Sequence, residues 1–132
     1  MNLQEFLNGN DVSNIEDEVV VSSRLKNPET GELYKFKIRA LTDKEWESAR
    51  RESTSIAKSR KEQVRFNQSG FNDKIVLTAT IYPNFKDAES LKTVGCINPE
   101  SYLHKVLLPG EIAELASKIT TLSKQEANAS IA

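Results

Sequence analysis

The sequence predicts an α+β fold, mainly α, in which an N-terminal β-hairpin is followed by a bundle of four to five short helices. A valine-rich run and a strictly alternating segment, separated by a turn signal at residues 27–31, predict the hairpin. Helix-capping residues and prolines that recur through the second half of the chain predict the helices. We expect one domain over residues 1–122, in which residues 1–17 form an acidic lead-in that can be flexible, and a disordered tail over residues 123–132.

The two hairpin strands are predicted at residues 18–25 and 34–41. The first is centred on three consecutive valines, which favour strands. The second alternates, so that one face carries Tyr34, Phe36, Ile38 and Ala40 and the other carries Lys35, Lys37 and Arg39. A lone hairpin is marginally stable in water, so its apolar face must pack on helices or on another subunit.

The first long helix has a well-marked start. Thr42 and Glu45 have the spacing of a capping box, and Leu41 and Trp46 occupy the two positions of a hydrophobic staple. Trp46 is therefore interpreted as a core anchor, the alternative being an exposed platform for a ligand. The Ser-Thr-Ser run at residues 53–55 is poor helix material and is expected to interrupt this helix.

Two other segments leave alternatives open. Residues 2–8 carry Leu3, Phe6 and Leu7 at helical spacing, which predicts a short amphipathic helix, with a frayed terminus as the alternative. Residues 73–82 are apolar nearly all round. Their β-branched content favours a strand, whereas their length and the proline that follows them favour a buried helix.

Three further helix starts lie in the second half of the chain. Asp87 is predicted to cap a helix over residues 88–94 that stops at Gly95, and Asn98 followed by a proline is a strong start for the next helix. The last helix is predicted to begin at Pro109. Its sustained apolar face is made of Ile112, Leu115, Ala116, Ile119 and Leu122.

The sequence indicates no catalytic centre, cofactor site or metal site. The chain has one histidine, His104, and one cysteine, Cys96, whereas metal sites usually need several such ligands. His104 is interpreted as a surface residue and Cys96 as a small buried residue. We expect a protein that is not an enzyme, although a pair of carboxylates brought together only by folding would leave no signal in the sequence.

Charge and hydropathy bear on the remaining classes. A net charge of -1 and 38% hydrophobic residues are typical of a globular domain. No apolar run is long enough to span a bilayer and no signal-peptide pattern is present, so we expect a cytoplasmic protein without membrane contact. Residues 19–65 hold twelve basic and seven acidic side chains, which leaves nucleic-acid binding as a weaker alternative.

Three short segments carry a resemblance to a known family. They are residues 37–42 running into the helix of Trp46, residues 81–87 (Ile-Tyr-Pro-Asn-Phe-Lys-Asp) and residues 102–111, which end in Leu-Leu-Pro-Gly-Glu. With these segments in this order and spacing, the chain resembles the XkdN-like phage tail assembly chaperones from about residue 19 to about residue 122. The resemblance favours the helical interpretation of residues 73–82.

The resemblance implies a function in the host cell cytoplasm during tail morphogenesis. Members of that family are thought to bind the tape measure protein, a long helical molecule that sets tail length, and to be absent from the mature virion. Related systems also make a longer frameshifted product, which would be a further partner. A small protein with spare apolar surface could keep such a client soluble, with avidity from many copies. The alternative is a minor structural component of the tail or baseplate.

The client surface is predicted on the last two helices. The candidate partner-binding residues are Leu103, Leu107, Ile112, Leu115 and Ile119. The alternative is that these side chains form the protein's own core, because a small domain needs its leucines there. Association of the chain with itself, as a homo-oligomer formed through an exposed hairpin edge, is a further expectation.

Overall fold

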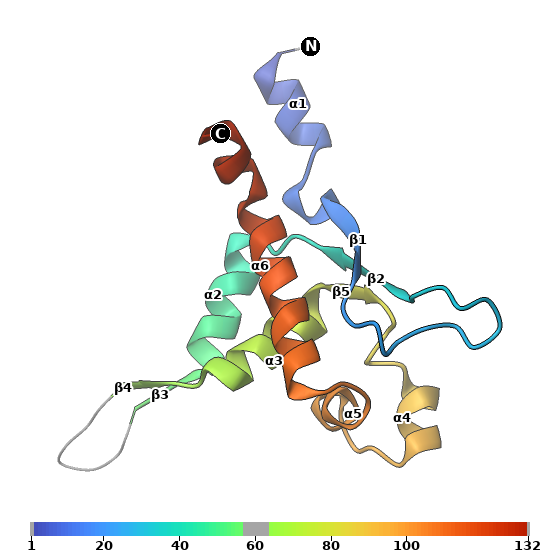
Figure 1. Ribbon diagram of the computed structural model, residues 1–132. Helices are drawn as coiled ribbons and strands as arrows, with labels where there is room; N and C mark the ends of the chain where they lie inside the picture. The colour runs from blue at the N-terminus through green and yellow to red at the C-terminus, as the bar shows by residue number, and fades with distance from the viewer. Residues whose placement is uncertain (1, 57–63, 132) are drawn as a thin grey trace.

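The computed structural model describes residues 2–56 and 64–131, and Figure 1 shows a small sheet packed against a group of helices. The chain begins with α1 (Leu3–Gly9), the 3-10 turn η1 (Val12–Asn14), β1 (Glu16–Val20) and β2 (Lys35–Arg39). It continues through α2 (Asp43–Glu52), β3 (Thr54–Ile56), β4 (Val64–Phe66), α3 (Gln68–Ala79), β5 (Thr80–Tyr82), α4 (Ala88–Val94), α5 (Pro99–Val106) and α6 (Pro109–Ile131). The predicted α+β class is confirmed, with β1 and β2 forming the hairpin.

The main sheet has three antiparallel strands in the order β1-β2-β5. Glu16 lies opposite Arg39, and Val20 lies opposite Lys35. The strand predicted at residues 18–25 is shifted, since β1 begins two residues earlier and ends at Val20. Opposite charges across the first pair favour the early start. Beyond Val20 the strand pairing is interrupted where Arg24 reaches across to Glu111 on α6, and it resumes where the Tyr34 N–H donates to the Leu25 carbonyl.

Residues 73–82 are both helix and strand. Most of the segment belongs to α3, where Ile75, Val76 and Ala79 enter the core. The last three residues leave the helix and pair with β2 as the short strand β5. The helical interpretation is therefore wrong for residues 80–82. Their β-branched and aromatic side chains suit a strand, and the free edge of β2 offers them backbone partners.

The predicted capping box at the start of α2 is confirmed. The Glu45 N–H donates to Thr42 Oγ1 at 3.2 Å, and the Thr42 N–H donates to the Glu45 carboxylate at 3.0 Å. The helix ends at Glu52, as the Ser-Thr-Ser run predicts. Ser53 Oγ and Thr54 Oγ1 donate to carbonyls four residues back and compete with continuation of the helix. The hairpin of β3 and β4 that follows is not predicted by the sequence.

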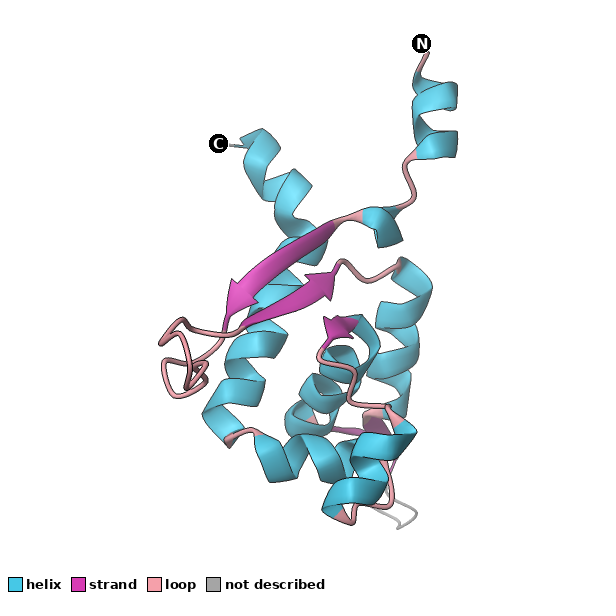
Figure 2. Cartoon of the chain, turned by 90° about the vertical axis from the view of Figure 1, so that its right-hand side faces the viewer, coloured by secondary structure: helices cyan, strands magenta, loops and turns pink. Residues whose placement is uncertain are grey.

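The core lies between the inner face of the sheet and helices α3, α5 and α6, and Figure 2 shows helices covering one face of the strands. Its largest fully buried side chains are Ile38, Ile75, Val76, Leu103, Leu115 and Ile119. The Trp46 ring packs edge-on against Phe71 with centroids 5.1 Å apart. Trp46 is partly buried against this cluster, which confirms its interpretation as a core anchor.

The later helices begin where the capping residues predict. Asp87 caps α4, Gly95 ends it with φ 73°, and Asn98 caps α5. The last helix, α6, begins at Pro109 as predicted and extends to Ile131, while the disordered tail over residues 123–132 stays a prediction. Ser123 accepts a hydrogen bond from the Leu41 N–H at 3.0 Å, and the residues that follow include good helix formers and no glycine or proline. The domain boundary at residue 122 stays a prediction.

Candidate functional site

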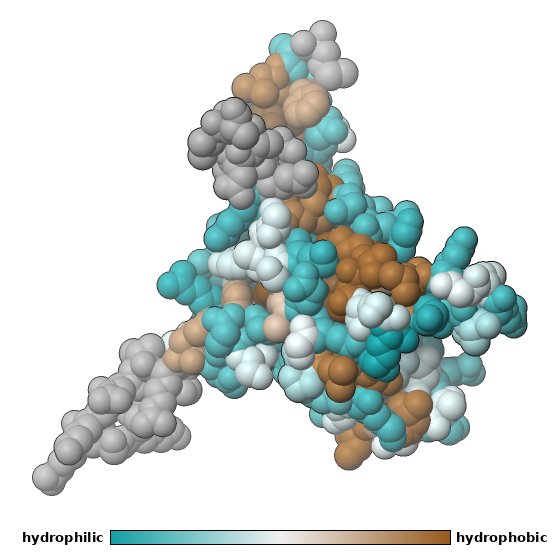
Figure 3. Space-filling view, viewed as in Figure 1, coloured by the Kyte–Doolittle hydropathy of each residue, from teal (hydrophilic) through white to brown (hydrophobic). Residues whose placement is uncertain are grey.

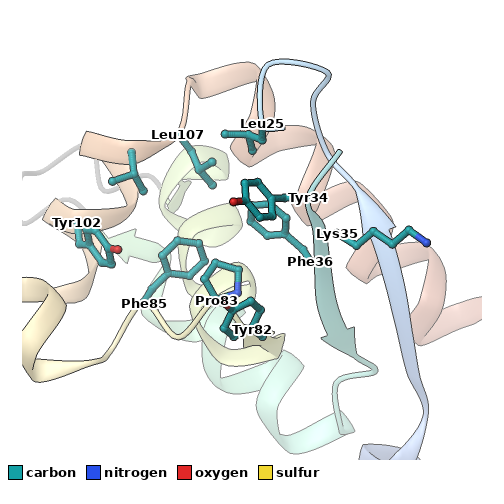
Figure 4. A pocket seen from close by; sticks show the side chains of 10 residues that line it. Leu25, Tyr34, Lys35, Phe36, Tyr82, Pro83, Phe85, Tyr102 and Leu107 are labelled. Carbon is teal, nitrogen blue, oxygen red and sulfur yellow. The ribbon is translucent and has the colours of Figure 1, made fainter. Parts of the chain in front are cut away.

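An open apolar groove of about 280 Å³ lies between the hairpin, β5 and the corner between α5 and α6. Its lining residues are Leu25, Tyr34, Lys35, Phe36, Tyr82, Pro83, Phe85, Tyr102, Val106 and Leu107. Figure 4 shows the rings of Tyr34, Phe36, Tyr82 and Phe85 gathered together, while the Lys35 side chain extends away from them. Aromatic and aliphatic side chains therefore dominate the wall of the groove.

The groove has a buried floor and an exposed rim. Phe36, Phe85 and Leu107 form the floor and belong to the hydrophobic core. The Phe85 ring lies 6.4 Å from Phe36 and 5.9 Å from Tyr102, centroid to centroid. Tyr34 is 49% exposed and Tyr82 is 67% exposed. Exposed aromatic rings above a floor held by the core are the kind of surface that contributes most to protein–protein binding.

An ion pair between Arg24 and Glu111 holds two walls of the groove together. Arg24 Nε and Nη2 donate to the two carboxylate oxygens at 3.0 and 2.7 Å, and Nη2 also donates to the Val106 carbonyl at 3.1 Å. Arg24 directly precedes Leu25, which lines the groove. The pair therefore fixes the loop after β1 against the corner between α5 and α6.

The Glu111 carboxylate is buried and keeps its negative charge in acid. Arg24 hydrogen-bonds the carboxylate and lowers the pKa of Glu111 from 4.5 to about 2, with a further contribution from the Leu108 N–H. Leu108 directly precedes α6, so Glu111 also satisfies a free N–H group at the start of that helix. A charge-assisted bidentate pair of this kind is more rigid than a single hydrogen bond.

A second pair of the same design joins β2 to α2. Arg39 Nη1 and Nη2 donate to the Glu45 carboxylate at 2.8 and 2.6 Å, and Nη2 also donates to the Thr78 carbonyl. These bonds lower the pKa of Glu45 from 4.5 to about 2, chiefly through Arg39. Glu45 is the same carboxylate that completes the capping box. The strand that supplies Phe36 to the groove is thus anchored to the helices.

The five partner-binding residues predicted from the sequence all lie in the core. The exposed fractions are 0% for Leu103, 6% for Leu107, 4% for Ile112, 0% for Leu115 and 0% for Ile119. Among them, Leu107 contributes to the floor of the groove. Such burial favours the alternative that the sequence leaves open, in which these side chains form the protein's own core. Contact between these residues and a client stays a prediction.

Sequence reasoning about a partner surface missed the rim residues Tyr34, Tyr82 and Tyr102. A signal for two of them was present, because residues 81–87 and 102–111 are segments that carry the family resemblance. Both segments contribute to the groove, where Phe85 of one packs on Tyr102 of the other. Their order along the chain gives no indication that they meet, since the contact forms only when α5 packs beside the loop that follows β5.

The basic stripe of β2 is largely neutralised. Lys37 pairs with Glu16 at 3.3 Å and lies opposite Glu18 on β1, and Arg39 pairs with Glu45. Lys58, Arg60 and Lys61, which contribute to the excess of basic residues over residues 19–65, lie outside the described residues. Paired charges of this kind give little support to nucleic-acid binding, which needs free cations to neutralise phosphates.

The single histidine and the single cysteine both lie outside the groove lining. His104 is on the surface, as predicted, and its Nε2 lies 2.7 Å from Asp73 Oδ2. Cys96 is half-buried rather than fully buried, because it follows the left-handed Gly95 at an exposed helix end. Among the described residues, no three His, Cys, Asp or Glu side chains could together hold a metal ion. None of the described helices has the length and apolar character required to cross a bilayer.

Comparison with known proteins identifies the family. Residues 3–129 match the phage XkdN-like tail assembly chaperone proteins. The chain belongs to this family. The match covers all three segments that carry the resemblance, and it confirms the family that they indicate.

The same fold occurs in a solved structure. The crystal structure of the protein yqbn superposes with a TM-score of 0.70 and covers 93% of this chain and 96% of that one. The two sequences are 24% identical, so the likeness concerns the fold alone. No curated protein matches the chain.

Proposed function

We propose that this tail assembly chaperone binds the tape measure protein and keeps it soluble during tail morphogenesis, with the aromatic groove as the client-binding surface. Membership of the family supports the assembly function. The observation that carries the choice of surface is the exposed rim of Tyr34 and Tyr82 above a buried floor. In this proposal the protein acts in the host cytoplasm and is absent from the mature virion.

The chemistry of the groove suits one face of an amphipathic helix. Apolar side chains spaced at i, i+3 and i+4 can insert between aromatic rings, whereas polar neighbours stay in water. Tyrosine rings offer large apolar contact area and keep a hydroxyl for the wet edge of the interface. A groove of this size binds weakly on its own, so many copies along one long client would be needed to cover it.

In this proposal the partner-binding residues predicted from the sequence have a structural role instead of contacting the client directly. Leu103, Ile112, Leu115 and Ile119 belong to the core, and of the five residues Leu107 alone lines the groove. A substitution among the four would disturb client binding by loosening the fold. Substitutions at the exposed rim test the contact itself.

We expect the double variant Tyr34→Asp/Tyr82→Asp to lose the client. In co-expression with the tape measure protein, the tagged wild-type chain should recover a soluble complex, while the client alone is insoluble. The double variant should recover at least roughly tenfold less soluble client, since each lost aromatic anchor weakens binding substantially. The matched control is Ile97→Asp, because Ile97 is 93% exposed and lies outside the groove lining.

Two results would contradict the proposal. If the double variant and the Ile97 control recover equal amounts of client, the groove is not the client site. If the wild-type chain stays unbound beside an insoluble client, and purified virions contain the chain, the protein is a minor structural component of the tail or baseplate. A longer frameshifted product, where one is made, should retain the same groove and co-purify with the same client.

A further inference from the structure

Helix α1 carries an apolar face that the rest of the described chain leaves open. Leu3 is 71% exposed, Phe6 51% and Leu7 56%, and no residue of α1 is buried. Figure 1 shows this helix projecting away from the body, and Figure 3 shows apolar side chains along it. A helix of seven residues is not stable alone in water, so an α1 with this face requires a packing partner.

The aromatic groove has the matching character. Its lining has one charged residue, Lys35, and no carboxylate. Four other surface pockets each include several polar or charged side chains, such as Asp17 and Lys118 in the pocket beside β1. The groove is therefore the described hollow that best accepts three large apolar side chains from one helix face.

The groove and α1 of one chain lie at opposite ends of the hairpin. The lead-in joins β1 at Glu16, opposite Arg39, whereas Tyr34 and Phe36 lie toward the end where Val20 meets Lys35. The four residue steps from Glu16 to Val20 separate these ends by ~13 Å. The Ala40 N–H donates to the Ile15 carbonyl at 2.8 Å, which holds the junction in place. The helix consequently points away from its own groove.

Charge favours a second copy as the partner. The segment before β1 is acidic, since α1 carries Glu5 as its one charged residue, Asp11 follows it, and residues 1–15 hold no lysine or arginine. The groove offers no carboxylate to repel them, and Lys35 is part of its lining. The acidic segment that includes α1 is thus electrostatically compatible with the aromatic groove.

We propose that α1 of one copy docks its Leu3, Phe6 and Leu7 face in the aromatic groove of a second copy. Each chain then offers one helix and one groove at opposite ends, so the contact is heterologous and links copies head to tail. This self-association goes beyond the proposed function and needs no client. A client helix would compete with α1 for the same groove.

Sedimentation velocity of the purified chain alone tests the contact. The wild-type mass should rise with concentration, whereas Leu3→Asp/Phe6→Asp and Tyr34→Asp/Tyr82→Asp should each stay monomeric. The control Ile97→Asp should associate like the wild type. Circular dichroism of each variant checks that the fold is retained, which the exposure of all five positions leads us to expect.

An equimolar mixture of the two double variants tests whether α1 and the groove bind each other. One variant keeps an intact groove and the other an intact α1, so the mixture should form pairs and nothing larger. A wild-type chain that remains monomeric up to millimolar concentration would overturn the proposal. So would a double variant that associates like the wild type, or a mixture that stays monomeric. None of these results depends on recovery of the tape measure protein.

Discussion

Replacing Leu115 with alanine is expected to lower the free energy of unfolding by about 3 kcal/mol. Leu115 is 0% exposed and belongs to the core cluster that α6 shares with the sheet and with α3. The surrounding side chains cannot all collapse into the space left behind, so a cavity adds to the lost burial. Urea denaturation followed by Trp46 fluorescence measures the loss, and the melting temperature should fall by about 10 °C.

Leu108→Ala is the matched control for this change. Leu108 precedes α6 directly and is 56% exposed, so its truncation should cost no more than about 0.5 kcal/mol. Equal losses in the free energy of unfolding at the two positions would show that Leu115 is not a core residue. The comparison also matters for function, because a Leu115 variant that loses client binding reports a loosened fold. Substitutions of the exposed rim tyrosines are expected to weaken client binding without lowering the free energy of unfolding.

The fold is expected to lose stability steeply between pH 4.5 and pH 2. Glu45 and Glu111 titrate near 4.5 when unfolded, whereas their arginine partners lower the pKa of each to about 2 in the folded chain. A lowered pKa means that the folded state binds protons less readily than the unfolded state. The stabilisation is therefore complete above pH 4.5 and disappears as the pH falls toward 2.

Each carboxylate is expected to account for about 2 kcal/mol of this loss, less than the full pKa change implies, because both ion pairs border solvent. Urea denaturation at intervals from pH 5 to pH 2.5 measures the slope. The double variant Glu45→Gln/Glu111→Gln keeps the size of both side chains and should be less stable at pH 7. It should also lose much less stability in acid than the wild type. A variant with an unchanged acid slope would show that other groups govern this transition.

The two proposals share one surface and suggest an order of events. Without a client, docking of α1 would cover the exposed tyrosines and limit unspecific association of an apolar groove. A tape measure helix with a longer apolar stripe could displace α1 by making more contacts. Copies released from one another would then line the client individually. Sedimentation of the chain with and without a client peptide would report this exchange directly.

Much of the fold is determined by short stretches of the sequence. The capping box of Thr42 and Glu45, the caps at Asp87 and Asn98, and the stop at Gly95 all lie where the sequence predicts them. The alternation of β2 likewise predicts which side chains are buried. These features could be predicted because each involves groups within about four residues of one another, whose geometry the local backbone dictates.

The groove and its supports depend on contacts between distant parts of the chain. Arg24 and Glu111 are separated by 87 positions, and residues 80–82 form a strand only because β2 offers them a free edge. The same helix periodicity describes a leucine that binds a client and one that fills the core. The sequence therefore could not decide whether Leu103 and Leu115 belong to a client surface or to the core. Packing of α5 and α6 against the sheet buried both residues and left Tyr34 and Tyr82 at the surface. Periodicity reports which side chains share a face, whereas tertiary packing determines what that face meets.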